Sequence, residues 1–231
     1  MTAVPSPDDI LPRLGPDVRE TVIVDDRSFL IERPSESDRL LDVPAVHAAF
    51  DQDEYMPYWA DLWPAARMLA KVMLREPWPA GQPALEIGCG LGLPGIAALA
   101  CGLSVTFSDY DPCALRYAAA NARLNGFDKF TTMQLDWRHP PADLRTEMLL
   151  AADLIYELRN IEPLVAFIRH VLLPDGVCLL TDQDRIPMHA LRQALESERL
   201  PYTTQIIRAG EPGGRRLKGT LYRIQSAATI K

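Results

Sequence analysis

A short apolar run at residues 84–87 leads directly into the glycine-rich sequence GCGLG and then into a stretch of small and apolar residues, Leu93–Ala100. An apolar strand, a glycine-rich turn and a helix, in this order, are typical of the first half of a βαβ unit. Glycine lets a ligand approach the backbone closely, and the start of a helix leaves backbone N–H groups without partners. The stretch therefore predicts an α/β fold with a ligand-binding loop.

Strand-like and helix-like segments alternate on both sides of this loop. We predict strands at residues 84–87, 105–107, 131–135, 148–152, 177–180, 202–207 and 220–224, with a turn at 174–176. We predict helices at 64–76, 93–100, 112–125, 161–172 and 187–198, the third capped by Asp111. This alternation predicts a doubly wound, mostly parallel sheet, to which the last two strands add an antiparallel hairpin at one edge.

A shorter N-terminal region precedes this pattern. Residues 1–16 are rich in proline and acidic residues and predict a poorly ordered or draped arm. Two β-prone runs, 21–24 and 29–31, predict a small hairpin. Residues 34–53 predict a loop with a short helix. We expect residues 1–56 to form an arm and hairpin packed on the core, and residues 57–231 to form the main domain.

The composition argues against several classes of protein. The net charge of -7 disfavours nucleic-acid binding, which normally begins with a basic surface. The four cysteines form no CxxC pair, which favours free thiols in a reducing compartment. No apolar run approaches the roughly 18 residues of a membrane span, and no secretory signal is evident. We therefore expect a soluble cytoplasmic protein.

The spacing of the glycines restricts the class of ligand that the loop can bind. Gly88, Gly90 and Gly92 form a GxGxG pattern, whereas the dinucleotide fingerprint GxGxxG needs glycine where this chain has Leu93. The loop therefore suits a nucleotide-like ligand without a pyrophosphate. The same departure disfavours a nicotinamide-dependent oxidoreductase.

Acidic residues stand at the ends of the next two predicted strands. Asp109 follows Gly88 by about the 20 residues that separate the loop from the ribose-binding acid in such units. Its carboxylate can accept hydrogen bonds from both ribose hydroxyls, and Tyr110 can lie flat on an adenine ring. Asp136 can accept a hydrogen bond from the adenine amino group, with Trp137 as an apolar wall. The alternative is that both carboxylates only cap turns.

Three further segments carry a resemblance to a known family. They are PYWADLWPAARMLA at residues 57–70, AADLIYE at 151–157 and LLTDQDR at 179–185. With the glycine loop, they make the chain similar to class I S-adenosylmethionine-dependent methyltransferases. Within that class, the chain resembles the family-16 group of protein lysine methyltransferases, which includes those of the electron-transfer flavoprotein β-subunit. In the third segment, Gln183 stands where the family's Asp-Pro-x-Arg stretch has proline.

The resemblance implies a Rossmann-like fold of seven strands. It also implies which residues would bind the methyl donor and which would act on the acceptor. S-adenosyl-L-methionine would place its aminocarboxylate against the glycine loop, with Glu86 orienting the ammonium, and S-adenosyl-L-homocysteine (SAH) would be the product. Trp59 and Trp63 would close one side of the pocket, because aromatic faces suit a sulfonium cation. Asp153 would orient the acceptor amine or take its proton, and Tyr156, expected one helical turn later, would align it. Core packing of the tryptophans and a helix-capping role for Asp153 are the alternatives.

These observations favour an enzyme that N-methylates a lysine side chain of a protein. A methyltransferase for the amine or hydroxyl of a small molecule would use the same pocket and stays open, as does a non-catalytic binding module on the same fold. We expect a protein or small-molecule acceptor, with no nucleic acid and no membrane partner. The four histidines are scattered without ligand spacing, so we expect no metal site.

Overall fold

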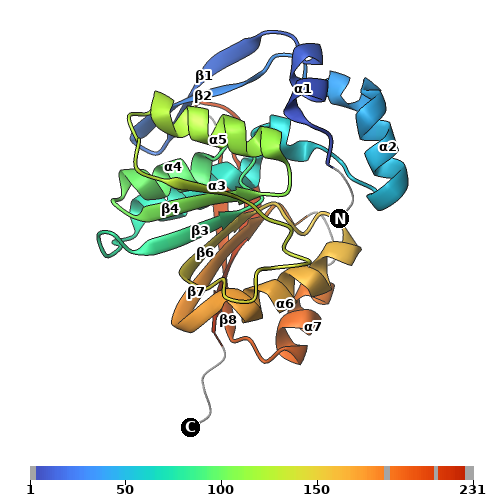
Figure 1. Cartoon of the computed structure of the whole chain (residues 1–231). Coiled ribbons are helices and arrows are strands. Elements are labelled where there is room, and N and C mark those ends of the chain that lie inside the picture. The colour runs from blue at the N-terminus through green and yellow to red at the C-terminus, as the bar shows by residue number, and fades with distance from the viewer. Residues whose placement is uncertain (1–3, 185–187, 211–212, 227–231) are drawn as a thin grey trace.

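A seven-stranded sheet runs through the middle of the molecule (Figure 1). The computed structural model describes residues 4–184, 188–210 and 213–226. The strands of the sheet are β3 (Pro83–Ile87), β4 (Ser104–Asp109), β5 (Thr131–Gln134), β6 (Thr146–Ala152), β7 (Leu172–Asp182), β8 (Tyr202–Ala209) and β9 (Leu217–Gln225). Their order is β5-β4-β3-β6-β7-β9-β8, and β9 alone among them runs antiparallel to both of its neighbours. The predicted doubly wound sheet with a C-terminal hairpin is confirmed.

Helices cover both faces of this sheet (Figure 1). One face carries α3 (Pro64–Arg75), α4 (Leu93–Ala100) and α5 (Pro112–Leu124), and the other carries α6 (Ile161–Val171) and α7 (Met188–Ser197). The predicted cap of α5 is confirmed, because Asp111 Oδ1 accepts a hydrogen bond from Cys113 N at 2.7 Å. None of the helices in the described part of the chain is long and apolar enough to cross a membrane.

The N-terminal region forms a layer outside the sheet. It consists of α1 (Pro7–Ile10), η1 (Leu11–Arg13), β1 (Asp17–Val24), β2 (Arg27–Pro34), η2 (Ser37–Asp42), α2 (Pro44–Asp53) and η3 (Tyr58–Ala60). The predicted hairpin is confirmed, since β1 and β2 pair in antiparallel register. The arm is more structured than the expected draped segment, because Ile10 and Leu14 are fully buried in the core. Apolar side chains hold this segment despite its prolines.

Two asparagines on α5 hold the backbone of β2. Asn121 Oδ1 accepts a hydrogen bond from Glu32 N at 2.7 Å, and its amide donates to the carbonyls of Glu32 and Leu91. One turn later, Asn125 exchanges the same pair of bonds with Leu30. Strand β2 is an edge of its two-stranded sheet, so these side chains satisfy groups that would otherwise lack partners. Asn121 also ties the hairpin to the glycine-rich loop.

The turn predicted at residues 174–176 is wrong. These residues lie inside β7, which begins at Leu172 rather than after the turn. Thr146 pairs with Leu172 while Met148 pairs with Val177, so the residues between them form an irregularity in the strand. Asp175 takes a φ of +64°, the left-handed conformation that aspartate tolerates better than most residues. Turn-forming residues here bend a strand without ending it.

We expect Asn121→Ala to lower the free energy of unfolding by about 2 to 4 kcal/mol, because it leaves buried backbone groups of β2 and the loop without partners. Asn125→Ala is the matched control. It removes similar bonds at an exposed position, where water replaces them, and should cost about 1 kcal/mol or less. Urea denaturation measures both. Equal losses in the two variants would contradict this account.

Candidate active site

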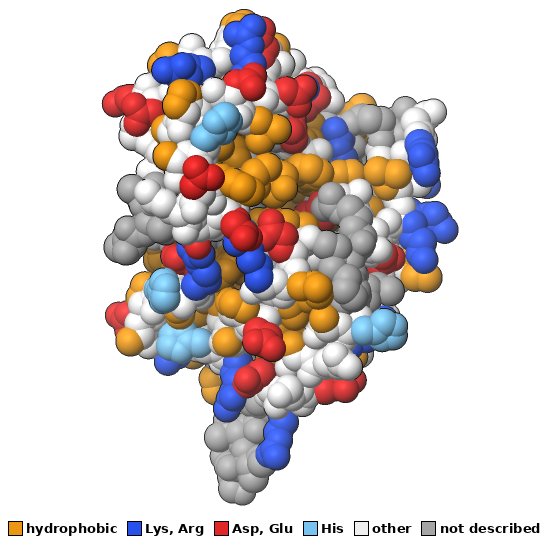
Figure 2. All heavy atoms as spheres, turned by 90° about the vertical axis from the view of Figure 1, so that its right-hand side faces the viewer, with side chains coloured by type: hydrophobic (Ala, Val, Ile, Leu, Met, Phe, Trp, Pro, Cys, Tyr) orange, Lys and Arg blue, Asp and Glu red, His pale blue; other side chains and the backbone are white. Residues whose placement is uncertain are grey.

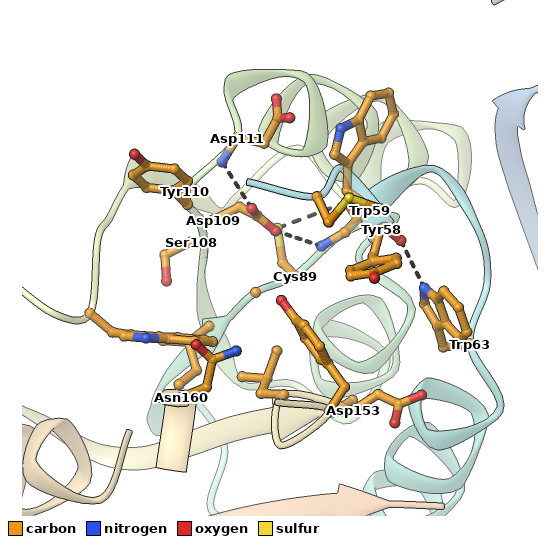
Figure 3. A pocket seen from close by; sticks show the side chains of 18 of the residues that line it. Tyr58, Trp59, Trp63, Cys89, Ser108, Asp109, Tyr110, Asp111, Asp153 and Asn160 are labelled. Carbon is orange, nitrogen blue, oxygen red and sulfur yellow. Dashed lines mark hydrogen bonds between the residues drawn. The ribbon is translucent and has the colours of Figure 1, made fainter. Parts of the chain in front are cut away.

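A pocket of about 470 Å³ opens at the carboxyl ends of β3, β4, β5 and β6 (Figure 3). From β3, the chain adds β4 and β5 on one side of the sheet and β6 and β7 on the other. Open α/β sheets bind ligands at the carboxyl ends of the strands where the order reverses in this way. All of the predicted site residues lie in the lining: Trp59, Trp63, Glu86, Gly88, Gly90, Gly92, Asp109, Tyr110, Asp136, Trp137, Asp153 and Tyr156. The topology thus brings together residues that are far apart in the sequence.

The glycine loop has a backbone that other residues rarely adopt. Gly88, Gly90 and Gly92 have φ values of +55°, +50° and +82°, all in the left-handed region. A Cβ atom at Gly92 would lie 2.9 Å from the Cβ of Ala118, and one at Gly88 would lie 2.5 Å from Leu154 Cδ2. The loop therefore needs glycine both for its conformation and for its packing.

The carboxylate of Asp109 joins this loop to the one after β4. Its Oδ2 accepts a hydrogen bond from Gly90 N at 3.0 Å, and its Oδ1 accepts one from Asp111 N at 3.0 Å. Burial raises the pKa of Asp109 to about 7, although these two N–H groups act to lower it. The side chain therefore changes its charge near neutral pH.

A buried carboxylate lies next to Asp109. Asp111 is 2% exposed and accepts a hydrogen bond from the Tyr55 hydroxyl. Burial raises the pKa of Asp111 and that of Tyr55. Nothing in the sequence pattern pointed to Tyr55, which comes from the segment between α2 and η3. The contact fixes that segment against the start of α5.

Glu86 lies under the loop. It is 2% exposed, and its Oε2 accepts a hydrogen bond from Gly95 N at 3.1 Å, in the first turn of α4. Burial raises the pKa of Glu86 well above its usual value. Part of its hydrogen-bonding capacity therefore connects β3 to the helix that follows the loop.

Asp136 forms an ion pair that sequence analysis missed. Arg138 Nε donates to Asp136 Oδ1 at 2.8 Å, and Arg138 Nη1 lies 2.7 Å from Asp53 Oδ2. Burial alone would raise the pKa of Asp136, but the hydrogen bonds from Arg138 hold it below its usual value. The guanidinium also lies 5.3 Å from the centre of the Tyr110 ring. The only sign of this ion pair in the sequence is that an arginine follows Asp136 two residues later.

The two predicted tryptophans have different surroundings. Trp59 is buried, and its ring stacks on Tyr117 with centroids 5.5 Å apart. Trp63 Nε1 donates to the carbonyl of Tyr58 at 2.7 Å, and the two rings meet edge to face at 6.0 Å. Tyr58 also meets Tyr156 edge to face at 5.1 Å. Tyr58, Trp63 and Tyr156 form what we call the aromatic trio.

The labelled side chains in Figure 3 divide between two sides of the pocket. Asp109 and Tyr110 lie on one side. Tyr58, Trp63 and Asp153 lie on the other. One side therefore offers hydrogen-bond acceptors at the end of β4, and the other offers aromatic surface beside a carboxylate.

The helical turn expected between Asp153 and Tyr156 is wrong. Asp153 has a φ of +61°, and residues 153–157 are not helical; the chain enters η4 (Leu158–Asn160) before α6. Asp153 N donates to the carbonyl of Thr181 at 2.8 Å, which holds this bend against β7. Tyr156 still lines the pocket, and burial raises the pKa of its hydroxyl, which stays protonated.

The end of β7 supports the pocket from outside. Gln183 Nε2 donates to Asp153 Oδ2 at 2.8 Å. Asp182 is buried and Asp184 is half-buried, but neither is among the described residues that line the pocket. Arg185 lies outside the described residues.

The mouth of the pocket is closed on one side by the end of α2. Arg159 pairs with Glu54 and with Glu157, and it also donates to the carbonyls of Asp53 and Glu54. Figure 2 shows this face of the molecule, where hydrophobic side chains form a band bordered by acidic and basic ones. The exposed hydrophobic residues include Phe50 and Leu158.

A sequence profile of a lysine methyltransferase family matches residues 49–196, more than half of the chain. The chain belongs to this family. Its relatives include the histone-arginine methyltransferase METTL23 of Homo sapiens, which is 33% identical over 46% of this chain and 60% of its own length. The electron transfer flavoprotein beta subunit lysine methyltransferase of Danio rerio is 42% identical over 30% of this chain and 28% of its own length. The chain thus spans less than two thirds of these relatives.

Solved structures share the fold. A TehB-like SAM-dependent methyltransferase of Corynebacterium glutamicum superposes with a TM-score of 0.55 at 17% identity, over 84% of this chain and all of that one. SMU.776, solved as a complex with SAH, gives 0.60 at 11% identity, over 89% of this chain and 56% of that one. At these identities the likeness concerns the fold alone.

We expect Gly92→Ala to lower the free energy of unfolding by roughly 2 to 4 kcal/mol, since it adds a close contact with Ala118 to an unfavourable φ. Gly102→Ala is the control. Its φ of +86° is similar, but a Cβ atom there meets nothing within 4 Å, so the loss should be roughly 1 kcal/mol. Thermal and urea unfolding separate the two. A larger loss for Gly102→Ala would overturn the packing account.

Proposed function

We propose that this chain is an S-adenosylmethionine-dependent methyltransferase that N-methylates a lysine side chain of a protein. The observation that carries the proposal is the Asp109 carboxylate, held at the pocket by the N–H groups of Gly90 and Asp111. Each bond uses one lone pair of one oxygen, so each oxygen keeps the capacity to accept from a ligand hydroxyl. A neighbouring pair of hydroxyls, as in ribose, matches this arrangement.

The glycine loop supports binding of the amino-acid end of the methyl donor. Its glycines leave no side chain over the strand end, so a carboxylate can approach the backbone of the loop closely. In the proposal Glu86 faces the ammonium, whose charge favours the ionised form of this buried acid. S-adenosylmethionine, when bound, supplies an electrophilic methyl group on a sulfonium.

The other strand ends suit the adenine ring. Asp136 keeps its role as acceptor for the adenine amino group, which requires it to share its carboxylate with Arg138. Trp137 supplies an apolar wall. Arg138 lies over one face of the Tyr110 ring, and in the proposal the other face of this ring contacts the adenine. Ion pairing with Asp53 keeps Arg138 at this end of the pocket when adenine binds.

The aromatic trio and Asp153 suit the acceptor. A lysine amine must be neutral to attack, although its usual pKa is about 10.4. Aromatic surface removes water from around the amine and thereby lowers its pKa, while Asp153 orients an N–H through a hydrogen bond. As the new C–N bond forms, the C–S bond breaks and the amine loses a proton to Asp153 or to water. Trp59 and Trp63 close the pocket between the two halves.

Charge and cysteine usage support the rest of the proposal. The chain carries a net charge of -7, which favours a basic protein segment over a nucleic acid as partner. The free cysteines fit a reducing compartment, so we retain a cytoplasmic location. Residues 1–56 would serve as an accessory layer on the methyltransferase domain, with the end of α2 at the pocket mouth.

SAH should bind about tenfold more tightly at pH 8 than at pH 6. A pKa of about 7 leaves roughly a tenth of Asp109 ionised at pH 6 and most of it ionised at pH 8, and the ionised form is the better acceptor for ribose hydroxyls. Calorimetry at the two pH values measures this. Asp109→Asn should bind weakly and lose the part of this dependence that comes from Asp109, while any part due to Glu86 stays. A wild-type affinity that does not change with pH would remove the ribose role.

Purified enzyme and radiolabelled S-adenosylmethionine, added to a cell extract, should label a discrete protein band. Asp153→Ala should lose at least 100-fold in labelling rate and retain its affinity for SAH, because the carboxylate acts on the acceptor. Label found only among small molecules would favour the small-molecule alternative. No label in either fraction would contradict the proposed function.

A further inference from the structure

The side chain of Asn160 does not cap the helix that it precedes. Asn160 ends η4 and stands at the N-cap position of α6, where an asparagine side chain commonly accepts a hydrogen bond from a backbone N–H group of the first turn. Its side chain makes no such bond here, because its backbone is already helical, with φ of -81° and ψ of -18°. The side-chain amide is therefore available for another partner.

This amide belongs to the lining of the pocket. Asn160 is half-buried, and within the part of the chain that the structure describes no other group forms a hydrogen bond with its side chain. Figure 3 shows the side chain on the same side of the pocket as Tyr110 and opposite Trp63. The proposed function assigns this part of the pocket to the adenine ring.

The backbone of Asn160 is held in place before a ligand binds. Its N–H donates to the carbonyl of Glu157 at 3.1 Å, and the next residue, Ile161, is buried in the core. The preceding residue, Arg159, forms an ion pair with Glu54 of the N-terminal layer. A side chain on such a fixed backbone loses less freedom on binding than one on a mobile loop.

Asp136 can satisfy only part of the edge of an adenine ring. Its carboxylate accepts hydrogen bonds from the backbone N, Nε and Nη2 of Arg138, which hold its pKa below the usual value and keep it ionised. An ionised carboxylate accepts hydrogen bonds but has none to donate. Adenine carries an amino group that donates, and beside it the ring nitrogens N1 and N7, which accept. A separate donor is needed for a ring nitrogen.

We propose that Asn160 helps to select adenine as the base of the methyl donor, by donating from its side-chain amide to a ring nitrogen beside the amino group. This inference rests on the proposed function. The asparagine amide has two N–H donors and a carbonyl acceptor, and it matches the amino group and ring nitrogen of adenine in other contexts. Asp136 and Asn160 together offer an acceptor beside a donor, which complements the donor beside an acceptor on the base.

Two variants of Asn160 test the inference. Asn160→Ala removes the amide, and Asn160→Asp keeps the size of the side chain but replaces its donors by an acceptor. Glu162→Ala, an exposed position two residues later that is outside the pocket lining, is the matched control. Calorimetry measures the affinity for SAH and for two analogues of SAH in which either N1 or N7 of the adenine is replaced by C–H. Thermal unfolding and turnover at saturating methyl donor are measured in parallel.

Wild type and Glu162→Ala should bind SAH equally. Both Asn160 variants should bind it about 5- to 50-fold more weakly, and Asn160→Ala should keep the wild-type Tm, because no capping bond is lost. One of the two analogues should lose the same factor against wild type and lose nothing further against Asn160→Ala. Turnover of Asn160→Ala at saturating methyl donor should stay within about twofold of wild type. If Asn160→Ala does not fold, Asn160→Asp takes its place in the comparison of analogues.

Unchanged affinity of either variant for SAH would overturn the inference and leave the proposed function in place. The same holds if both analogues lose affinity additively with the substitution, because Asn160 would then contact neither ring nitrogen. Turnover lost at saturating methyl donor, with SAH affinity intact, would place Asn160 at the acceptor instead. A wild-type chain that binds no SAH would contradict the proposed function itself.

Discussion

The pocket depends on the two backbone hydrogen bonds that the Asp109 carboxylate accepts. One comes from Gly90 in the loop after β3, and the other comes from Asp111, the residue that caps α5. A single side chain thus sets the distance between two loops that parallel strands bring to the same edge of the sheet. The left-handed glycines let the loop approach this carboxylate, and the Tyr55 contact with Asp111 anchors the N-terminal layer to the same point.

The sheet order explains why the pocket has two unlike halves. Strands β4 and β5 lie on one side of β3, and β6 and β7 lie on the other, so their loops meet across the glycine-rich turn. Acceptor groups for a nucleoside come from the first pair, through Asp109 and Asp136. Aromatic surface and the buried Asp153 come from the second pair together with η3. In the proposed reaction, the methyl group passes between these halves.

Much of this could be predicted from the sequence. The mostly parallel sheet follows from the alternation of apolar runs and helices, and polar residues that follow its parallel strands share one edge. The bend at Asp153 could not be predicted, because it depends on a bond to Thr181 on another strand. The same holds for Arg138, whose partner Asp53 comes from α2, and for Gln183, whose partner lies 30 residues away. Local patterns specify elements; contacts between elements decide how side chains point.

A crystal structure of the chain with SAH tests the central claim most directly. The account predicts both ribose hydroxyls within about 3 Å of the Asp109 oxygens, with the Gly90 and Asp111 bonds retained. It also predicts the sulfur atom between the glycine loop and the aromatic trio, so that the position of the lost methyl group faces Asp153. A ribose bound by other residues, or a sulfur atom turned away from Asp153, would contradict the account.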